Sequence, residues 1–525
     1  MSSGDEPHPD RRKQESTGTR PGFKPRSKKS RNVVSIDIDT AENRTANRTW
    51  LQKFNQWAKT GGKGLAVSLV VHAVALVILG LFVLKSQQRN DVDSLILTWS
   101  EPGVLVQPAS PKSRRAFTTP VDVASIAGSV PAEKNSSPSP GTNTAPGALG
   151  VVPVGVGGAL AGRNQRMRNA NLEQLGGSSD SERAIKAGLG WLARHQTGDG
   201  HWELHQGYPD AGRSYVKTDT GATALALLAF LGHGDTHQSG EHQQVVEKGL
   251  KWLREIQDPV TGDLHDQRQE QGRNAAFYAH SMATIALCEA LAMTHDAQLR
   301  PAAELAVKYL IESQHPDMGG WKYRPLTQRV MSGDISVTAW ALMALHSARI
   351  AGISVPQEEF QRSSGFLDRV QEQGGARYKY EPNEPETRVT VARTAIGLLC
   401  RQWLGWPKTH PPLVDGVKFL MEDRNRPQWS AGKRNVFEWY YITQVVHNMG
   451  GDDWKLWSAA ILEAVVRNQV SSGSSKPGQD VRGSWSPRPE GEGEEYADKA
   501  GRLYLTAMCV LILETPYRHR PIYEE

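Results

Sequence analysis

The stretch KAGLGWLARHQTGDGHW, residues 186–202, decides the fold because its pattern recurs along the chain. It contains an aromatic–aliphatic pair, Trp191-Leu192, followed by Gln196 and then by a Gly-x-Trp sequence that ends at Trp202. Self-similarity at a fixed period is the signature of a repeat architecture. Further copies, whole or partial, occur at Trp252-Leu253 with Gln257, Tyr309-Leu310 with Gln314 and Trp321, Phe366-Leu367 with Gln371, Phe419-Leu420, and in a worn form before Gln469.

A second type of segment lies between these copies and is apolar nearly all round, as in TGATALALLAFLG and DISVTAWALMAL. A helix without a polar face has to be buried on every side. Each unit is therefore expected to be an amphipathic helix, a turn that carries Gly and Trp, and a buried helix. One threonine aligns the apolar segments at Thr223, Thr284, Thr338, Thr394, Thr443 and Thr506, with spacings of 61, 54, 56, 49 and 63 residues.

Six such helical pairs place their apolar helices inside and their amphipathic helices outside. An open solenoid would leave its end pairs uncapped, whereas a closed ring buries the apolar helices of every pair. The sequence thus predicts an all-α protein, an α/α toroid of about six helical hairpins over residues 180–525.

At these residues the chain resembles the terpene-cyclase and protein-prenyltransferase superfamily, with its squalene–hopene-cyclase-like "QW" repeats. The resemblance runs from about residue 180 to 515. It implies the toroid fold and a structural role for the QW residues, and a glutamine that ends an outer helix can satisfy unpaired backbone groups there. The residues concerned are Trp191, Gln196, Trp202, Trp252, Gln257, Gln314 and Trp321.

The resemblance does not extend to the catalytic motifs of the superfamily. Its protonation-initiated cyclases use an acidic DxDD motif, and its protein prenyltransferases hold zinc with an Asp-x-Cys pair and a distant histidine. Neither motif occurs in residues 180–525. Whether the domain is an enzyme is therefore left open, and no metal or cofactor is predicted.

Candidate site residues stand four positions before the aligned threonines, where the apolar helices begin. Because such helix starts would face one mouth of a toroid, Asp219, His280 and Asp334 are the candidate catalytic residues. The alternative is that the aspartates cap the helices that follow, and that Arg502 pairs with an acid. The candidate ligand-binding residues are Arg502, Trp439, Glu438, Trp340 and Tyr278.

Residues 64–84, GLAVSLVVHAVALVILGLFVL, form an uncharged run that is long enough to cross a bilayer as a helix. Residues 1–63 carry 14 Lys/Arg against 7 Asp/Glu, which predicts a cytoplasmic N-terminus and an extracytoplasmic C-terminal domain at the inner membrane. We expect residues 1–63 to be a disordered basic tail, and residues 85–179, rich in Pro, Gly and Ser, to be a flexible linker.

Ser68 and His72 interrupt this span and share one helix face. One interpretation is a tolerated neutral histidine; the other is a proton pathway or partner contact. The Ser68-x-x-x-His72 spacing, with a short cytoplasmic lead and a proline-containing linker, resembles the anchor of TonB-type energy transducers. That resemblance implies docking on an ExbB/ExbD-like proton channel.

The composition argues against nucleic-acid binding and against a cysteine-based metal site, and three hypotheses for the function remain. The net charge of +5 over 525 residues gives no support to nucleic-acid binding, and the three cysteines lie in apolar runs without metal-ligand spacing. The first hypothesis is a non-catalytic, membrane-tethered toroid that binds a lipid, another small molecule or a protein. The second is a terpenoid cyclase or another toroid enzyme with a relocated acid, and the third is a TonB-like energy or signal transducer.

Overall fold

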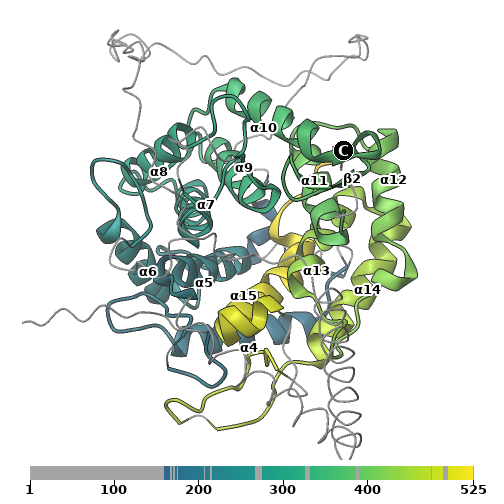
Figure 1. The fold of residues 1–525 in the computed structure, drawn as a ribbon. Helices are drawn as coiled ribbons and strands as arrows, with labels where there is room; N and C mark the ends of the chain where they lie inside the picture. Colours follow the sequence, from purple (N-terminus) through teal and green to yellow (C-terminus); the bar gives the residue numbers. More distant parts are fainter. Residues whose placement is uncertain are drawn as a thin grey trace, which may run out of the picture. The chain divides into compact units, whose positions relative to one another are not determined.

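A computed structural model describes residues 159–523, except 166–167, 169–171, 174–175, 206, 213–215, 267–274, 325–331, 386–388, 475 and 489–494. These residues contain twelve α-helices and form a ring (Figure 1). The inner helices are α5 (Asp219–His233), α7 (Ala276–Thr294), α9 (Ile335–Ile350), α11 (Val391–Trp403), α13 (Val436–Met449) and α15 (Glu495–Arg518). The outer helices are α4 (Ser179–Arg194), α6 (Gln243–Ile256), α8 (Arg300–Glu312), α10 (Gln357–Val370), α12 (Pro411–Leu420) and α14 (Gly451–Arg467).

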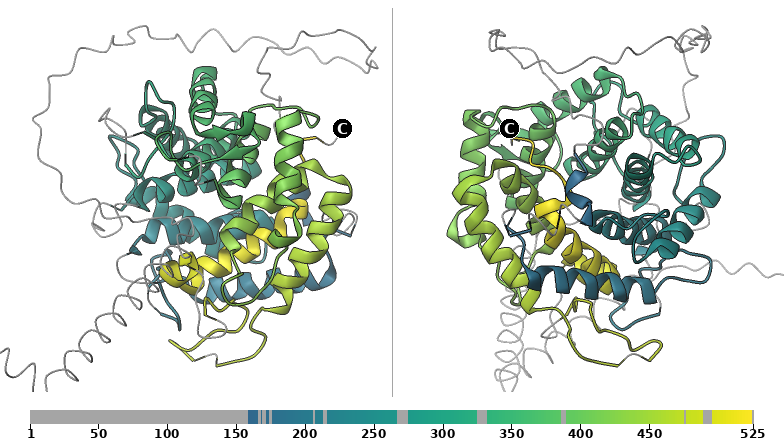
Figure 2. Two further views of the ribbon diagram at one scale, coloured as in Figure 1. Left: turned by 45° about the vertical axis from the view of Figure 1, so that its right-hand side comes forward. Right: turned by 180° about the vertical axis from the view of Figure 1, so that it is seen from behind.

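The ring closes because each inner helix packs against the next one in the sequence and α15 packs against α5. In the outer layer, the last helix, α14, contacts the first one, α4. Two views from other directions show the inner helices surrounded by the outer ones (Figure 2). The predicted all-α toroid is confirmed. Small elements complete the described chain: η2 (Ala161–Arg163), η5 (Gln373–Gly375), η7 (Asp423–Asn425), and the strands β1 (Gln371–Glu372) and β2 (Arg377–Tyr378), which pair antiparallel.

Burial explains why the two helix types take these places. All fifteen residues of α5 are buried, whereas α6 buries five of its fourteen along one stripe. A helix that is apolar all round cannot face water, so it occupies the inner layer. The three cysteines are buried as expected, each within an inner helix.

The glutamines that end the outer helices join neighbouring hairpins. The amide of Gln196 donates to the Gly200 carbonyl at 2.8 Å and to the Val245 carbonyl of the next outer helix at 2.9 Å. Gln257 and Gln314 make the equivalent pairs of bonds. Gln469 closes the circle, because it donates to Ala184 of α4 at 2.7 Å. These four glutamines therefore fasten their own hairpins to the next ones around the ring.

The aligned threonines have a matching role between turn and inner helix. The Thr223 hydroxyl accepts the backbone N–H of Trp202 at 3.0 Å, and Thr338 accepts that of Trp321 at 3.1 Å. Thr394 and Thr506 bind Tyr378 and Trp485 in the same way. Each threonine thus satisfies a buried backbone donor, which would otherwise cost free energy.

Packing begins before residue 180, the predicted start of the toroid. Ala159, Leu160 and Arg163 are buried, and η2 packs against α5 and α15. Arg163, which lies in the stretch predicted to be a linker, is thus paired with a buried acid of the ring, Glu289.

The predicted cytoplasmic tail, the span at residues 64–84 with Ser68 and His72, and most of the linker lie outside the described residues. Among the residues that are described, one helix, α7, is long and apolar enough to cross a membrane. Of its most apolar window, 83% is buried inside the protein, as its place in the inner layer requires.

Candidate functional site

A cavity of about 110 Å³ lies among the amino-terminal halves of the inner helices and next to the start of α15. Its wall is mainly apolar, and none of its described lining residues carries a carboxylate. Thr218, the residue that caps α5, and Lys499 are among the polar groups that reach it. The aromatic part of the wall consists of Tyr278, Tyr323, Trp340, Phe437, Tyr496 and Tyr504.

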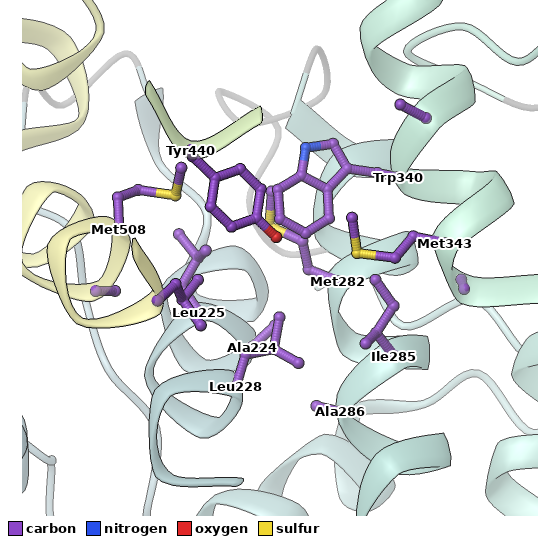
Figure 3. Packing of buried hydrophobic residues seen from close by; sticks show 14 of the residues in the cluster. Ala224, Leu225, Leu228, Met282, Ile285, Ala286, Trp340, Met343, Tyr440 and Met508 are labelled. Atoms are coloured by element: carbon purple, nitrogen blue, oxygen red, sulfur yellow. The ribbon is translucent and has the colours of Figure 1, made fainter. Parts of the chain in front are cut away.

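Side chains fill the centre of the ring beside this cavity. The rings of Trp340 and Tyr440 stack with centroids 5.9 Å apart. Figure 3 shows this pair together with Met282, Met343 and Met508 from three different inner helices. Because Trp340, Met282 and Met508 also line the cavity, the packed centre forms part of its wall. Two of the predicted ligand-binding residues, Trp340 and Tyr278, therefore face the cavity.

Asp334 caps α9 and is connected to the cavity wall by hydrogen bonds. Its carboxylate accepts the backbone N–H groups of Ser336 at 3.0 Å and Val337 at 2.9 Å, so the capping interpretation holds. The Ser336 hydroxyl donates to Asp334 at 2.7 Å and lies 2.7 Å from the hydroxyl of Tyr278. Burial raises the pKa of Asp334, although Lys322 and the hydrogen bonds at the cap oppose that effect. Asp334 itself is not among the lining residues.

His280 has a structural place rather than one at the cavity. Its Nδ1 accepts the Leu264 N–H at 3.2 Å, so its Nε2 carries the hydrogen that bonds to the Ala306 carbonyl at 3.1 Å. Burial lowers the pKa of His280 to about 4, which keeps the ring neutral. In this hairpin His280 accepts a backbone N–H of the turn, which is the role that the aligned threonines have in other hairpins.

The other predicted ligand-binding residues also lie away from the cavity. Arg502 pairs with Asp210 and donates to the Pro209 carbonyl at 3.0 Å, as the ion-pair alternative expected. Trp439 is buried against Trp429, with ring centroids 6.0 Å apart, and Glu438 lies in the first turn of α13. These residues lie at the starts of inner helices as predicted, but their side chains are not among those that line the cavity.

Asp219 lies instead in a polar cluster that the sequence analysis missed. Its Oδ2 is 3.8 Å from Nε2 of His201, and Oε1 of Glu203 is 3.5 Å from the same nitrogen. One ligand atom from each of the three residues lies within 4.8 Å of the others. His201 and Glu203 flank Trp202 in the repeat turn, and an alternation of polar and apolar residues was the signal that could have identified them.

A buried ionic cluster occupies the carboxy-terminal ends of the inner helices, opposite the cavity. The Arg163 guanidinium makes two bonds to the Glu289 carboxylate, at 2.8 and 3.0 Å, and Arg518 approaches the same carboxylate at 3.1 Å. Burial alone would raise the pKa of Glu289, but the two arginines lower it to about 2. Arg163 and Arg518 also donate to carbonyls of α5, where the helix dipole favours cations.

Comparisons with known proteins give one partial sequence match. A stretch of 164 residues is 27% identical to the drimenyl diphosphate synthase of Streptomyces showdoensis, and it covers 30% of this chain and 27% of that protein. The match thus spans about a quarter of the relative's length. No protein family matches the sequence.

Solved structures give similarity at low sequence identity. The type II terpene cyclase MstE from Scytonema has a TM-score of 0.42 and 13% identity, over 64% of this chain and 97% of that one. The α-1,6-mannanase of Salegentibacter sp. HEL1_6 has the same TM-score and identity, over 64% and 98%. The all-α toroid of this chain is established by its own helix contacts.

Proposed function

We propose that the toroid is a non-catalytic binding module that holds an apolar molecule in the aromatic cavity. The cavity wall carries the proposal, because it is mainly apolar and has six aromatic side chains and no carboxylate among its described residues. Small-molecule sites are concave, predominantly apolar and aromatic, with a few polar groups that fix orientation. The span predicted at residues 64–84 would tether this module to the inner membrane, outside the cytoplasm.

Isothermal titration of the full chain in mild detergent tests this function, with geranylgeraniol as an isoprenoid probe and palmitate as a straight-chain probe. Ala275 lines the cavity and is half-buried, so Ala275→Phe should fill the space and weaken binding at least tenfold. The matched control Ala297→Phe adds the same bulk at an exposed position and should bind normally. Equal binding by both variants would place the ligand elsewhere.

A terpenoid cyclase is the second candidate, favoured by the partial similarity to a drimenyl diphosphate synthase and by the bonds that join Asp334 to Tyr278. In this case Asp334 would deliver a proton through Ser336 and Tyr278 to a substrate in the cavity. A cyclised product from geranylgeraniol or farnesyl diphosphate, detected by mass spectrometry, would decide for the enzyme and against a non-catalytic module.

Asp334→Asn then separates acid chemistry from folding. Asparagine caps helices about as well as aspartate does, so the variant should fold normally and lose any cyclase activity. Tyr278→Phe should also lose activity if the proton travels through the Tyr278 hydroxyl. Product formation that is unchanged in Asp334→Asn would remove Asp334 from the mechanism.

A further inference from the structure

We propose that His201, Glu203 and Asp219 hold a divalent transition-metal ion, a role that is independent of what the cavity binds. An imidazole nitrogen and two carboxylate oxygens are the donor set that Zn²⁺ and Mn²⁺ accept. The three side chains come from the turn after α4 and from the first residue of α5, so two separate segments bring them together.

The distances around His201 fit an ion better than a hydrogen bond. Its Nε2 lies 3.5 Å from Glu203 Oε1 and 3.8 Å from Asp219 Oδ2. Both separations exceed the 2.7–3.2 Å range of an N–H···O bond. Two ligands that each lie about 2.1 Å from a tetrahedral ion are about 3.4 Å apart, which is close to the observed separations.

The orientation of the His201 ring is fixed from its other side. Nδ1 lies 2.7 Å from Oδ1 of Asp199, and the Thr197 hydroxyl donates to the same oxygen at 2.6 Å. With Nδ1 engaged by Asp199, the other ring nitrogen, Nε2, faces the carboxylates of Glu203 and Asp219. One imidazole nitrogen and two carboxylate oxygens thus point toward the same place.

The surroundings hold this arrangement in place and leave it accessible. The His201 ring stacks on Trp252 with centroids 5.1 Å apart and planes inclined by 21°. A carboxylate on the second nitrogen and a packed ring are the usual means of orienting a metal-binding histidine. The side chains of His201, Glu203 and Asp219 are 14%, 25% and 10% exposed, so an ion can enter from solvent.

Three protein ligands leave a fourth tetrahedral position open, as in catalytic rather than structural zinc sites. Leu204 and Thr218, the chain neighbours of Glu203 and Asp219, line the cavity. The ion would therefore lie beside the cavity wall, with a coordination position for water or for an anionic group.

The test uses the full chain without a polyhistidine tag, stripped with a chelator and dialysed against Zn²⁺ or Mn²⁺. Elemental analysis and titration should find one tightly bound equivalent. His201→Ala and Asp219→Asn should weaken that binding at least a hundredfold, and Asp199→Asn, which removes only the orienting carboxylate, should weaken it ten- to a hundredfold. The exposed controls His295→Asn and Glu312→Gln should bind normally.

Two results would overturn the proposal: no bound equivalent with either ion, or binding that His201→Ala and Glu203→Gln leave unchanged. Glu203→Gln is the milder variant because Glu203 is half-buried, so it keeps the test decisive if His201→Ala misfolds by circular dichroism. An NMR spectrum with His201 doubly protonated at neutral pH, and unaltered by Zn²⁺, would identify a proton as the cation and equally overturn it. Ligand titration of the cavity variant reports separately on the proposed function.

Discussion

Replacing Arg163 by methionine should destabilise the toroid by about 3 kcal/mol, because it removes one side of a buried ion pair. The Arg163 and Glu289 side chains are 1% and 2% exposed, so water cannot replace the lost partner. Breaking a buried pair costs about 3–5 kcal/mol. Arg518 stays 3.1 Å from the Glu289 carboxylate and compensates part of its charge, which places the expected cost at the lower end.

Urea unfolding of the full chain, followed by tryptophan fluorescence, measures this cost. Arg183→Met is the matched control, because Arg183 and Asp180 form an exposed pair with side chains 76% and 63% accessible. Such pairs contribute about 0–1 kcal/mol. Glu289→Gln should also destabilise, and the double variant should lose at least about 1 kcal/mol less than the sum of the two single losses. Additive losses, or a cost below about 1 kcal/mol for Arg163→Met, would refute the reasoning.

Three further changes test other parts of the ring. Gln469→Ala should cost roughly 1–3 kcal/mol in urea unfolding, since the Ala184 carbonyl loses its 2.7 Å donor; an unchanged midpoint would mean that water replaces it. Gly319→Ala should cost roughly 3 kcal/mol, because φ is +79° and a Cβ would lie 1.8 Å from the Arg362 carbonyl oxygen; a normally stable variant would contradict this. His280, with its pKa lowered from 6.5 to about 4, should withdraw about 3 kcal/mol of stability as pH falls from 6.5 to 4. Between these pH values the unfolded chain binds a proton at His280 and the folded chain does not. His280→Gln should therefore reduce the pH dependence of the free energy of unfolding, and an unaltered dependence would mean that other groups cause it.

The fold could be predicted because its signals are periodic. An outer helix that ends in glutamine and an inner helix without a polar face each occur in several copies, and six of the latter fit a closed ring. Gln196 belongs to a complete copy of the repeat and Gln469 to an incomplete one. Both nevertheless donate to a carbonyl of their own turn and to a carbonyl of the next outer helix. These hydrogen bonds need only the glutamine itself, so they can form even where the other residues of the repeat pattern are absent.

The site was harder to predict because equivalent positions in the repeats do not place their side chains in equivalent surroundings. His280 and Asp334 occupy equivalent positions before their threonines, yet one bridges two backbone groups and the other caps a helix. Tyr278 and Trp340 reach the cavity from positions that differ by eight relative to those threonines. His201 and Asp219 are 18 positions apart, and only the path of the turn brings them together.

The two ends of the ring differ in charge for a reason that lies in the backbone. The inner helices α5, α7 and α15 place their amino-terminal halves at the cavity and their carboxy-terminal parts at the ionic cluster, so their dipoles add along the axis. The negative end attracts Arg163 and Arg518, and Glu289 then neutralises cations that no solvent reaches. Because η2 supplies Arg163, part of this cluster comes from outside the six hairpins. The cavity therefore lies toward the positive end of these helices, where Asp219, Asp334 and the proposed ion also lie.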